Sequence, residues 1–138
     1  MATWGEFAAA EPELAAFGAE RLLIPPAYLA TVRRSGAPRV HPVTPREPTS
    51  PKGRDLRERG GFAMHNGVPD DEGTGGEFFC SGLAFAVEDP SLRALVTEAA
   101  RFEPEPRYVL FELQLTEARC NGYGDVKLPA HRRWPAAT

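Results

Sequence analysis

The stretch ATVRRSGAPRVHPV, residues 30–43, gives the strongest indication of fold in this sequence. Residues 27–33, which include its start, are rich in types that favour β-strands, and Arg34-Ser35-Gly36-Ala37 is typical of a turn. A second extended segment follows at residues 38–44. The stretch therefore predicts a β-hairpin.

A helix is predicted after the hairpin, at residues 50–59. Ser50 is a favourable N-cap, and Pro51 suits the first helical position. The first turn of a helix presents unpaired backbone N–H groups to an anion, and here Lys52 and Arg54 add positive charge beside them. This pattern predicts a local phosphate site. An ordinary capped helix with solvated basic side chains explains the same residues, so another segment has to decide between the two.

The remaining segments predict further strands with helices between them. A capping box at Thr3 and Glu6 opens a helix that Pro12 interrupts, and a second helical segment continues to the prolines at 25 and 26. Strands are predicted at 62–66, 77–87 and 108–120, a helix at 89–102, and an acidic, glycine-rich loop at 67–76. The tail, residues 121–138, has little periodicity and is expected to need another surface to order it. This order indicates an α+β domain built on a small barrel.

Length and charge limit the classes of function. The 138 residues predict a single domain over 1–138, and a net charge of −3 argues against a nucleic-acid partner. No apolar run approaches the roughly 20 residues that span a bilayer, so we expect no membrane partner and a cytoplasmic location. His41, His65 and His131 lack metal-ligand spacing, and Cys80 and Cys120 are interpreted as small buried hydrophobes, so no metal site is expected.

Three segments in order resemble the FMN-binding family related to pyridoxamine 5′-phosphate oxidase. Residues 30–43 resemble its first hairpin, with an "ATV…G.P.V.PV" pattern. SPKGRDL at residues 50–56 resembles the helix start that binds the FMN phosphate, and EFFCSGLA at 77–84 resembles the next long strand. The resemblance covers about residues 4–134. It implies a split β-barrel, mainly β with flanking helices, that forms a homodimer with two FMN sites, each made by both subunits.

The resemblance also implies which residues bind the cofactor. They are strand residues beside the flavin ring, residues of the helix start at the phosphate, and residues from the partner subunit. In that order they are His41, Pro42, Val43 and Thr44; Ser50 and Lys52; and Glu77, Phe78, Arg132 and Trp134, the last two on a weaker match. Phe78 and Phe79 point to opposite faces of a strand, and the family register favours Phe78 toward the ligand.

The implied function is that of an FMN-dependent oxidoreductase acting on a small molecule of unknown identity. A flavin performs the hydride or electron transfer while the protein positions it, and no residue stands out as a catalytic acid or base. Two alternatives stay open: a reductase that binds the deazaflavin F420, and a flavin- or small-ligand-binding protein without catalytic activity.

The chain departs from the family pattern between the hairpin and the helix. The family has a turn and a third strand there, whereas residues 44–49 join the two elements directly. We expect the recorded chain to omit residues at this point, which a break in the backbone would reveal. The alternative is a true deletion, which would leave an unpaired sheet edge beside residues 38–44, place Lys52 far from His41 and weaken the expectation of flavin binding.

Overall fold

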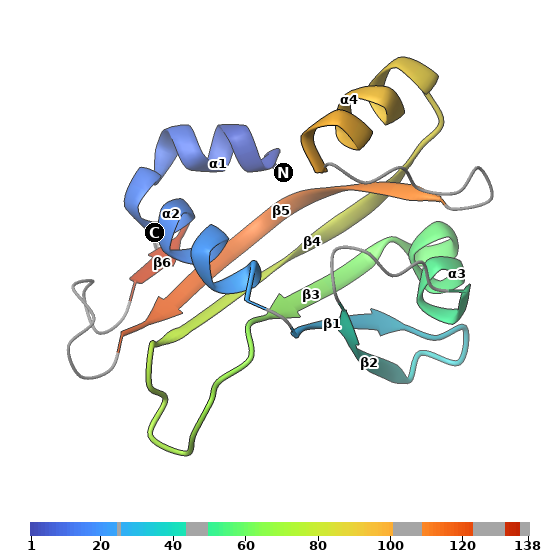
Figure 1. The fold of residues 1–138 in the computed structure, drawn as a ribbon. Helices are drawn as coiled ribbons and strands as arrows, with labels where there is room; N and C mark the ends of the chain where they lie inside the picture. Colours follow the sequence, from blue (N-terminus) through green and yellow to red (C-terminus); the bar gives the residue numbers. More distant parts are fainter. Residues whose placement is uncertain (25, 44–49, 101–108, 123–131, 136–138) are drawn as a thin grey trace.

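The computed structural model describes residues 1–24, 26–43, 50–100, 109–122 and 132–135. Within these ranges the elements follow the predicted order of strands and helices, with one further short strand at residues 132–134 that was not predicted (Figure 1). They are α1 (Trp4–Ala10), α2 (Pro12–Leu22), β1 (Ala27–Val32), β2 (Pro38–Val43), α3 (Ser50–Arg59), β3 (Gly61–His65), β4 (Glu77–Val87), α4 (Pro90–Ala100), β5 (Leu110–Asn121) and β6 (Arg132–Trp134). The predicted bounds differ from these by at most a few residues at each end.

The strands form one antiparallel sheet in the order β2-β1-β3-β4-β5-β6. The hairpin of β1 and β2 pairs Ala27 with Val43 and Val32 with Pro38, as the turn at Gly36 predicts. Among the described residues β2 pairs only with β1, so it forms one edge of the sheet, and β6 forms the other. The junction at residues 44–49, on which the prediction of an omitted strand depends, lies outside the described residues.

One face of the sheet, called here the covered face, packs against helices. Helices α1 and α2 lie over β4 and β5, while α3 packs on β1 and β4 (Figure 1). The core on this face is formed by apolar side chains from all these elements: Phe7, Leu14, Ala15, Phe17, Leu29, Leu56, Phe62, Phe78, Cys80, Ala84, Leu115, Ala118 and Cys120. The helices thus shield one side of the sheet, and the opposite side is called here the open face.

The N-terminal helices form for the reasons that the sequence indicates. The Thr3 hydroxyl accepts from the Glu6 N–H, and the Glu6 carboxylate accepts from the Thr3 N–H at 2.7 Å, which completes the capping box. Pro12 then starts α2 at its first position, where a missing N–H costs nothing. In the part of the chain that the structure describes, no helix is long and apolar enough to span a membrane.

The described part of the tail, residues 132–135, packs on other elements of the same chain, which supply the surface that the sequence predicts it to need. β6 pairs with residues 118–120 of β5. Arg132 forms ion pairs with Glu11 at 2.6 Å and Glu13 at 2.9 Å, and the Trp134 ring lies 5.0 Å from that of Phe7. The acidic residues at the junction of α1 and α2 therefore dock the last strand, a long-range contact that local periodicity does not reveal.

Candidate functional site

The start of α3 is fixed on the hairpin by a buried carboxylate. Asp55 is 4% exposed and accepts from the Thr31 hydroxyl at 2.8 Å, from Arg39 at 2.8 Å and from Arg59 at 3.2 Å. Burial alone would raise the pKa of Asp55, but these hydrogen bonds and the Arg39 charge outweigh it and hold the pKa below its ordinary value. The network joins both strands of the hairpin to α3 and sets the position of its first turn.

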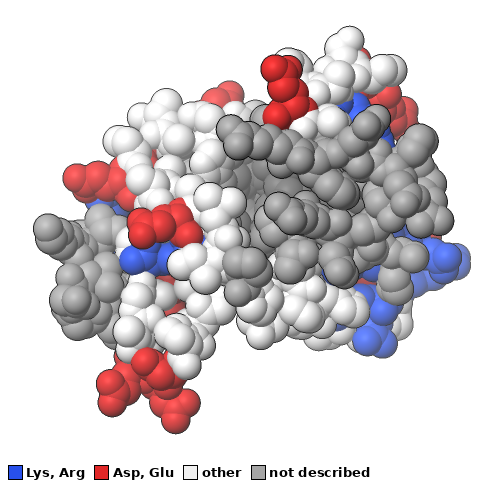
Figure 2. All heavy atoms as spheres, viewed as in Figure 1, with Lys and Arg blue, Asp and Glu red and all other residues white. Residues whose placement is uncertain are grey.

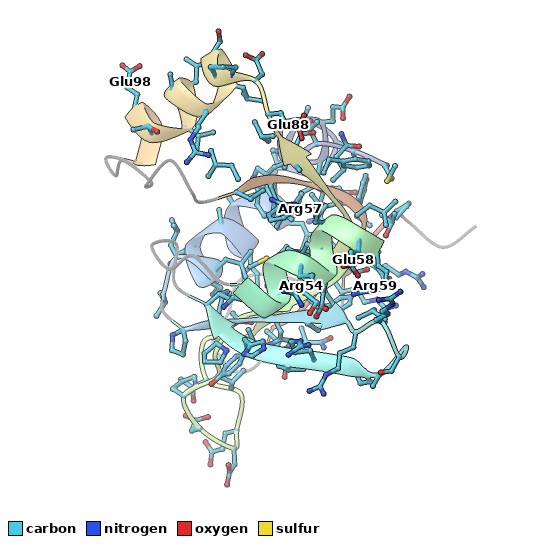
Figure 3. All side chains as sticks on the ribbon, turned by 90° about the vertical axis from the view of Figure 1, so that its right-hand side faces the viewer. Arg54, Arg57, Glu58, Arg59, Glu88 and Glu98 are labelled. Atoms are coloured by element: carbon cyan, nitrogen blue, oxygen red, sulfur yellow. The ribbon has the colours of Figure 1, made fainter. Side chains whose placement is uncertain are left out.

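That first turn carries Lys52, which is only 7% exposed. Arg59, at the other end of α3, donates to the Val32 carbonyl beside the hairpin turn, and Figure 3 shows Arg54 farther along the helix from this end. Asp55 and Arg59 both contact the turn end of the hairpin, so the start of α3, with Lys52, is directed away from that turn. The expectation that a true deletion at the junction would place Lys52 far from His41 stays a prediction, because residues 44–49 lie outside the described residues.

His41 is the residue of β2 whose side chain lacks a partner. It pairs across the strands with Leu29, which is buried, so its imidazole is on the covered face with α3. In the part of the chain that the structure describes, its Nε2 atom is buried and makes no hydrogen bond. A buried polar atom without a partner costs roughly 1–3 kcal/mol, and a ligand that hydrogen-bonds it would recover that energy.

The other predicted ring contacts are residues of the same edge strand. Pro42 and Val43 follow His41 on β2, and Thr44 lies outside the described residues. Because β2 pairs on one side only among the described residues, the backbone groups of its outer side are available to a ligand. Ser50 is the first residue of α3, but its side chain is not described. The described residues of this group, His41, Pro42 and Val43, are therefore consecutive on the edge strand.

The residues expected from a partner subunit lie elsewhere. Arg132 and Trp134 belong to β6, the opposite edge of the sheet, roughly 24 Å from β2 at about 4.8 Å per strand. Glu77 starts β4 on the open face, with its side chain 32% exposed. Within one chain these residues are thus separated from β2 by most of the width of the sheet. The predicted composite site requires a second copy of the chain.

The expected orientation of Phe78 is wrong. Its side chain is fully buried on the covered face, where its ring lies 6.1 Å from that of Trp4 and against Gly18. Phe79 takes the open face instead and lies 5.9 Å from the Arg119 guanidinium. The physical reason is that α1 and α2 cover the sheet at this point, and the larger gain in burial goes to the residue that faces them.

The open face carries a lateral row that sequence reasoning did not find. Register places Tyr28 opposite His65, His65 opposite Phe79, Phe79 opposite Arg119, and Arg119 opposite Arg133. These five side chains, called here the open-face row, come from five different strands. Only the pairing of strands brings them together, so no local motif could have predicted the row.

A shallow groove of about 340 Å³ runs beside the open-face row. Small side chains form its floor, because Ala30 pairs with Ala63 and Ala63 with Ser81. Larger groups border it, including Val32, which is 38% exposed. The open face therefore combines a flat, mainly apolar depression with an adjacent imidazole and two arginines.

Charge is distributed unevenly over the molecule (Figure 2). Acidic side chains gather on the loop of residues 67–76, and basic ones over the hairpin and α3. The latter are Arg33, Arg34, Arg39, Lys52, Arg54, Arg57 and Arg59. An acidic protein therefore has a locally positive end, which is where the sequence predicts a phosphate.

The interior offers little reactive chemistry. An apolar cavity of about 380 Å³ on the covered face is lined by Trp4, Leu22, Phe62, Met64, Cys80, Glu112, Leu113 and Leu115. Burial raises the pKa of the Cys80 thiol to about 12, so this thiol stays protonated at neutral pH. Among the residues described, no three His, Cys, Asp or Glu side chains are grouped to hold a metal ion.

Comparison with known proteins identifies the fold. No protein-family model and no curated protein matches the chain. Among solved structures, it is similar to a heme binding protein from Mycobacterium smegmatis, with a TM-score of 0.63 and 16% identity over 89% of this chain and 58% of that one. A pyridoxamine 5′-phosphate oxidase-related, FMN binding protein from Nostoc punctiforme gives a TM-score of 0.58 and 16% identity over 91% of this chain and 87% of that one.

A third similar structure is HutZ, the heme storage protein from Vibrio cholerae, with a TM-score of 0.52 and 20% identity over 76% of this chain and 89% of that one. The chain thus has the α+β split-barrel fold of the pyridoxamine 5′-phosphate oxidase-related proteins, as the sequence resemblance implied. It spans 58% of the length of the Mycobacterium smegmatis protein.

Proposed function

We propose that this protein binds FMN, with the phosphate at the start of α3 and the ring along the outer edge of β2. The observation that carries the proposal is the buried Nε2 of His41, which has no partner among the described residues, on an edge strand whose neighbouring helix α3 has a buried lysine, Lys52, in its first turn. Support also comes from the Nostoc punctiforme protein of the same fold, whose description is that of an FMN binding protein.

Each of these residues has a defined role in the proposed site. Lys52 supplies a positive charge close to the start of a helix, and the lysine charge and the unpaired N–H groups of the helix start together favour binding of a phosphate dianion. His41, with its proton on Nε2, donates to an acceptor of the ligand and removes the cost of an unpaired buried nitrogen. Backbone N–H and C=O groups of β2 match the donors and acceptors at the polar edge of a flavin ring. The bound flavin would supply hydride or electron transfer.

We further propose that the chain acts as a homodimer. Large apolar side chains are exposed near the end of β4 and the start of β5, and on α4. Helix α4 lies between these two strands in the chain and is near the same end of the sheet (Figure 1). The exposed side chains are Phe85 at 43%, Leu92 at 37%, Leu95 at 62%, Val96 at 40% and Val109 at 38% exposure. A patch of this kind favours association with a second copy, which would also bring a second set of edge residues to the cofactor.

The binding proposal is tested by titrating the protein against FMN and against riboflavin, which lacks the phosphate. Replacing Lys52 with Met removes one charge-assisted contact, worth about 1.5–3 kcal/mol, and should weaken FMN binding roughly 10- to 100-fold. Riboflavin binding should not change. Arg34→Met, on the exposed hairpin turn, is the matched control and should leave both affinities unchanged.

Two results would overturn the flavin assignment. The first is the absence of FMN binding by wild-type protein at micromolar concentrations. The second is an equal loss of FMN and riboflavin affinity in Lys52→Met, because that would place Lys52 away from the phosphate. Thermal unfolding of each variant shows whether a loss of affinity reflects a loss of fold.

The proposed reaction class is that of a flavin-dependent oxidoreductase with a small-molecule substrate. Consumption of NAD(P)H in the presence of FMN and a dye acceptor tests for it, and reduced F420 in place of NAD(P)H tests the deazaflavin alternative. No turnover with any donor would leave a flavin- or ligand-binding protein without catalytic activity.

A second candidate cofactor is heme, because a heme binding protein and a heme storage protein have the same fold. The specific observation that favours it is a single imidazole, His65, standing between two aromatic rings beside the groove of the open face. Titration with hemin, alone and after saturation with FMN, distinguishes the two cofactors and shows whether they compete.

A further inference from the structure

We propose that the hairpin turn and the outer face of α3 form a docking surface for an acidic segment of another protein. This inference goes beyond the proposed function and does not depend on any cofactor. The surface is called here the arginine surface. Its exposed cations are Arg33, Arg34, Arg54 and Arg57.

The charge of this region is opposite to that of the rest of the chain. Residues 27–43 and 50–59, which form the hairpin and α3, contain seven Lys and Arg and two Asp and Glu, a net charge of +5. The whole chain has a net charge of −3, so the remainder carries −8. The ten residues of α3 span about 15 Å, or about two Debye lengths at physiological salt, so the positive charge acts as one local field.

The cations of the arginine surface are available to a partner. In the part of the chain that the structure describes, their side chains form no ion pair or hydrogen bond. The carboxylates of the same region are already paired with other arginines: Asp55 is buried and accepts from Arg39 and Arg59, and Glu58 lies 2.8 Å from Arg59. The local acids therefore leave the charge of the exposed arginines for a second molecule.

The packing of α3 determines which of its side chains point outward. Asp55 and Leu56 are 4% and 6% exposed, so their side of the helix faces the protein. Arg54 and Arg57 are three residues apart, which makes them neighbours on the outer side of the helix, and both are exposed. Figure 3, in which α3 faces the viewer, labels both arginines on this helix.

A hydrogen bond joins the other two arginines to the same surface. The Nε atom of Arg59, in the last turn of α3, donates to the Val32 carbonyl at 2.7 Å. The next two residues of the chain are Arg33 and Arg34, which begin the hairpin turn and are exposed. The end of α3 and the hairpin turn are thus held together, and their arginines lie at one end of the molecule.

Exposed apolar side chains beside the arginines favour a protein as the partner. Val32 and Val40, on the open face of the hairpin, are 38% and 62% exposed. Protein–protein interfaces combine apolar contacts with arginine, whereas nucleic-acid interfaces are more polar and much more positively charged. A protein segment that carries both carboxylates and apolar side chains matches this composition.

Neighbouring carboxylates disfavour a nucleic acid on the same surface. Figure 3 shows Glu88 and Glu98 on the α4 side of α3, and both residues are exposed. A DNA duplex of about 20 base pairs is roughly 70 Å long and carries negative charge along its whole length, so it extends far beyond α3 and over the acidic remainder of the protein. A short acidic protein segment fits within the positive region.

The test is fluorescence anisotropy of a labelled glutamate-rich peptide titrated with the protein at low and high salt. We expect binding at low salt that weakens about tenfold or more at high salt. Arg34→Gln/Arg57→Gln should lower the affinity at low salt roughly 2- to 30-fold, because two surface charge contacts are lost. Arg119→Gln/Arg133→Gln makes the same change in net charge on the open face and should leave the affinity unchanged.

The other occupants give distinct results. No peptide binding at low salt, or an equal loss in the two double variants, overturns the proposal. A duplex of about 20 base pairs that binds more tightly than the peptide assigns the surface to nucleic acid and also overturns it. Salt-dependent self-association that Arg34→Gln/Arg57→Gln abolishes assigns it to a second copy, with the same consequence.

A final control separates this surface from the proposed cofactor site. Saturating FMN should leave the affinity for the peptide unchanged, and displacement of the peptide by FMN would overturn the proposal of a separate surface. If the protein does not bind FMN, the peptide titration is unaffected. Thermal unfolding should be similar in both double variants and wild type, because Arg34 and Arg57 make no side-chain contact that the fold needs.

Discussion

Replacing Phe78 with Ala tests the arrangement of the sheet, with Phe79→Ala as the neighbouring control. Phe78 is fully buried and packs on Trp4 and Gly18, whereas Phe79 is partly buried on the open face. Loss of the buried ring forfeits about 2–3 kcal/mol of transfer free energy. A residual cavity on the order of 50–100 Å³, at about 24 cal/mol/Å³, adds about 1–2.5 kcal/mol. The expected cost of Phe78→Ala is therefore about 3–5 kcal/mol in the free energy of unfolding.

Thermal and urea unfolding monitored by circular dichroism measure this difference. At about 3 °C per kcal/mol for a chain of this size, Phe78→Ala should lower Tm by roughly 10–15 °C. Phe79→Ala should cost less than about 1.5 kcal/mol, or roughly 5 °C, because its ring is already partly in water. Equal losses, or a larger loss in Phe79→Ala, would refute the assignment of Phe78 to the covered face.

Three further predictions follow from the burial and contacts of single residues. At the irregularity in the pairing of β4 with β5, a Cβ at Gly82 would clash with the Gln114 carbonyl. Gly82→Ala should therefore destabilise the fold by about 1–3 kcal/mol in urea unfolding, and an unchanged unfolding midpoint would argue against this pairing. Burial raises the pKa of both cysteine thiols, Cys80 and Cys120. Ellman's reagent at pH 8 should therefore detect no thiol in the native protein and two thiols in guanidinium chloride, and rapid labelling of the native protein would contradict this prediction. Folding lowers the pKa of Asp55, so the contribution of this carboxylate to stability is present above the ordinary carboxyl pKa and is lost as pH falls through the lowered value. Asp55→Asn should therefore be less stable than wild type at pH 7 and should lose less stability below about pH 4. Parallel pH profiles of stability for the two proteins would disprove the network.

Most of the fold was predictable because its signals are local. The turn at residues 34–37, the capping box at Thr3 and the proline at the start of α2 each act within a few residues, and each appears in the structure where the sequence indicates. The docking of β6 was not predictable, since the attraction between Arg132 and the acids of α1 and α2 spans more than a hundred residues of sequence.

The candidate sites divide in the same way. Lys52 was predicted to be functional because it lies in the first turn of a helix that a proline and serine mark. His65 was set aside as one of three scattered histidines. Its surroundings come from the Asn66 carbonyl, which accepts from its Nδ1, and from residues of two neighbouring strands, and none of these contacts is local in a way that sequence shows. Phe78 was placed on the wrong face because an isolated strand does not show which side the helices will cover.

Native mass spectrometry of the purified protein, incubated with FMN and hemin together, tests the central claim most directly. The chain mass is 15.1 kDa, so a homodimer with one FMN in each subunit has a mass that distinguishes it from every monomeric, empty or heme-only species. We predict the dimer with two FMN, which persists when the excess ligand is removed. A monomer, or a dimer that retains no FMN at micromolar protein, would contradict the proposal that this fold holds a flavin between two copies of the chain.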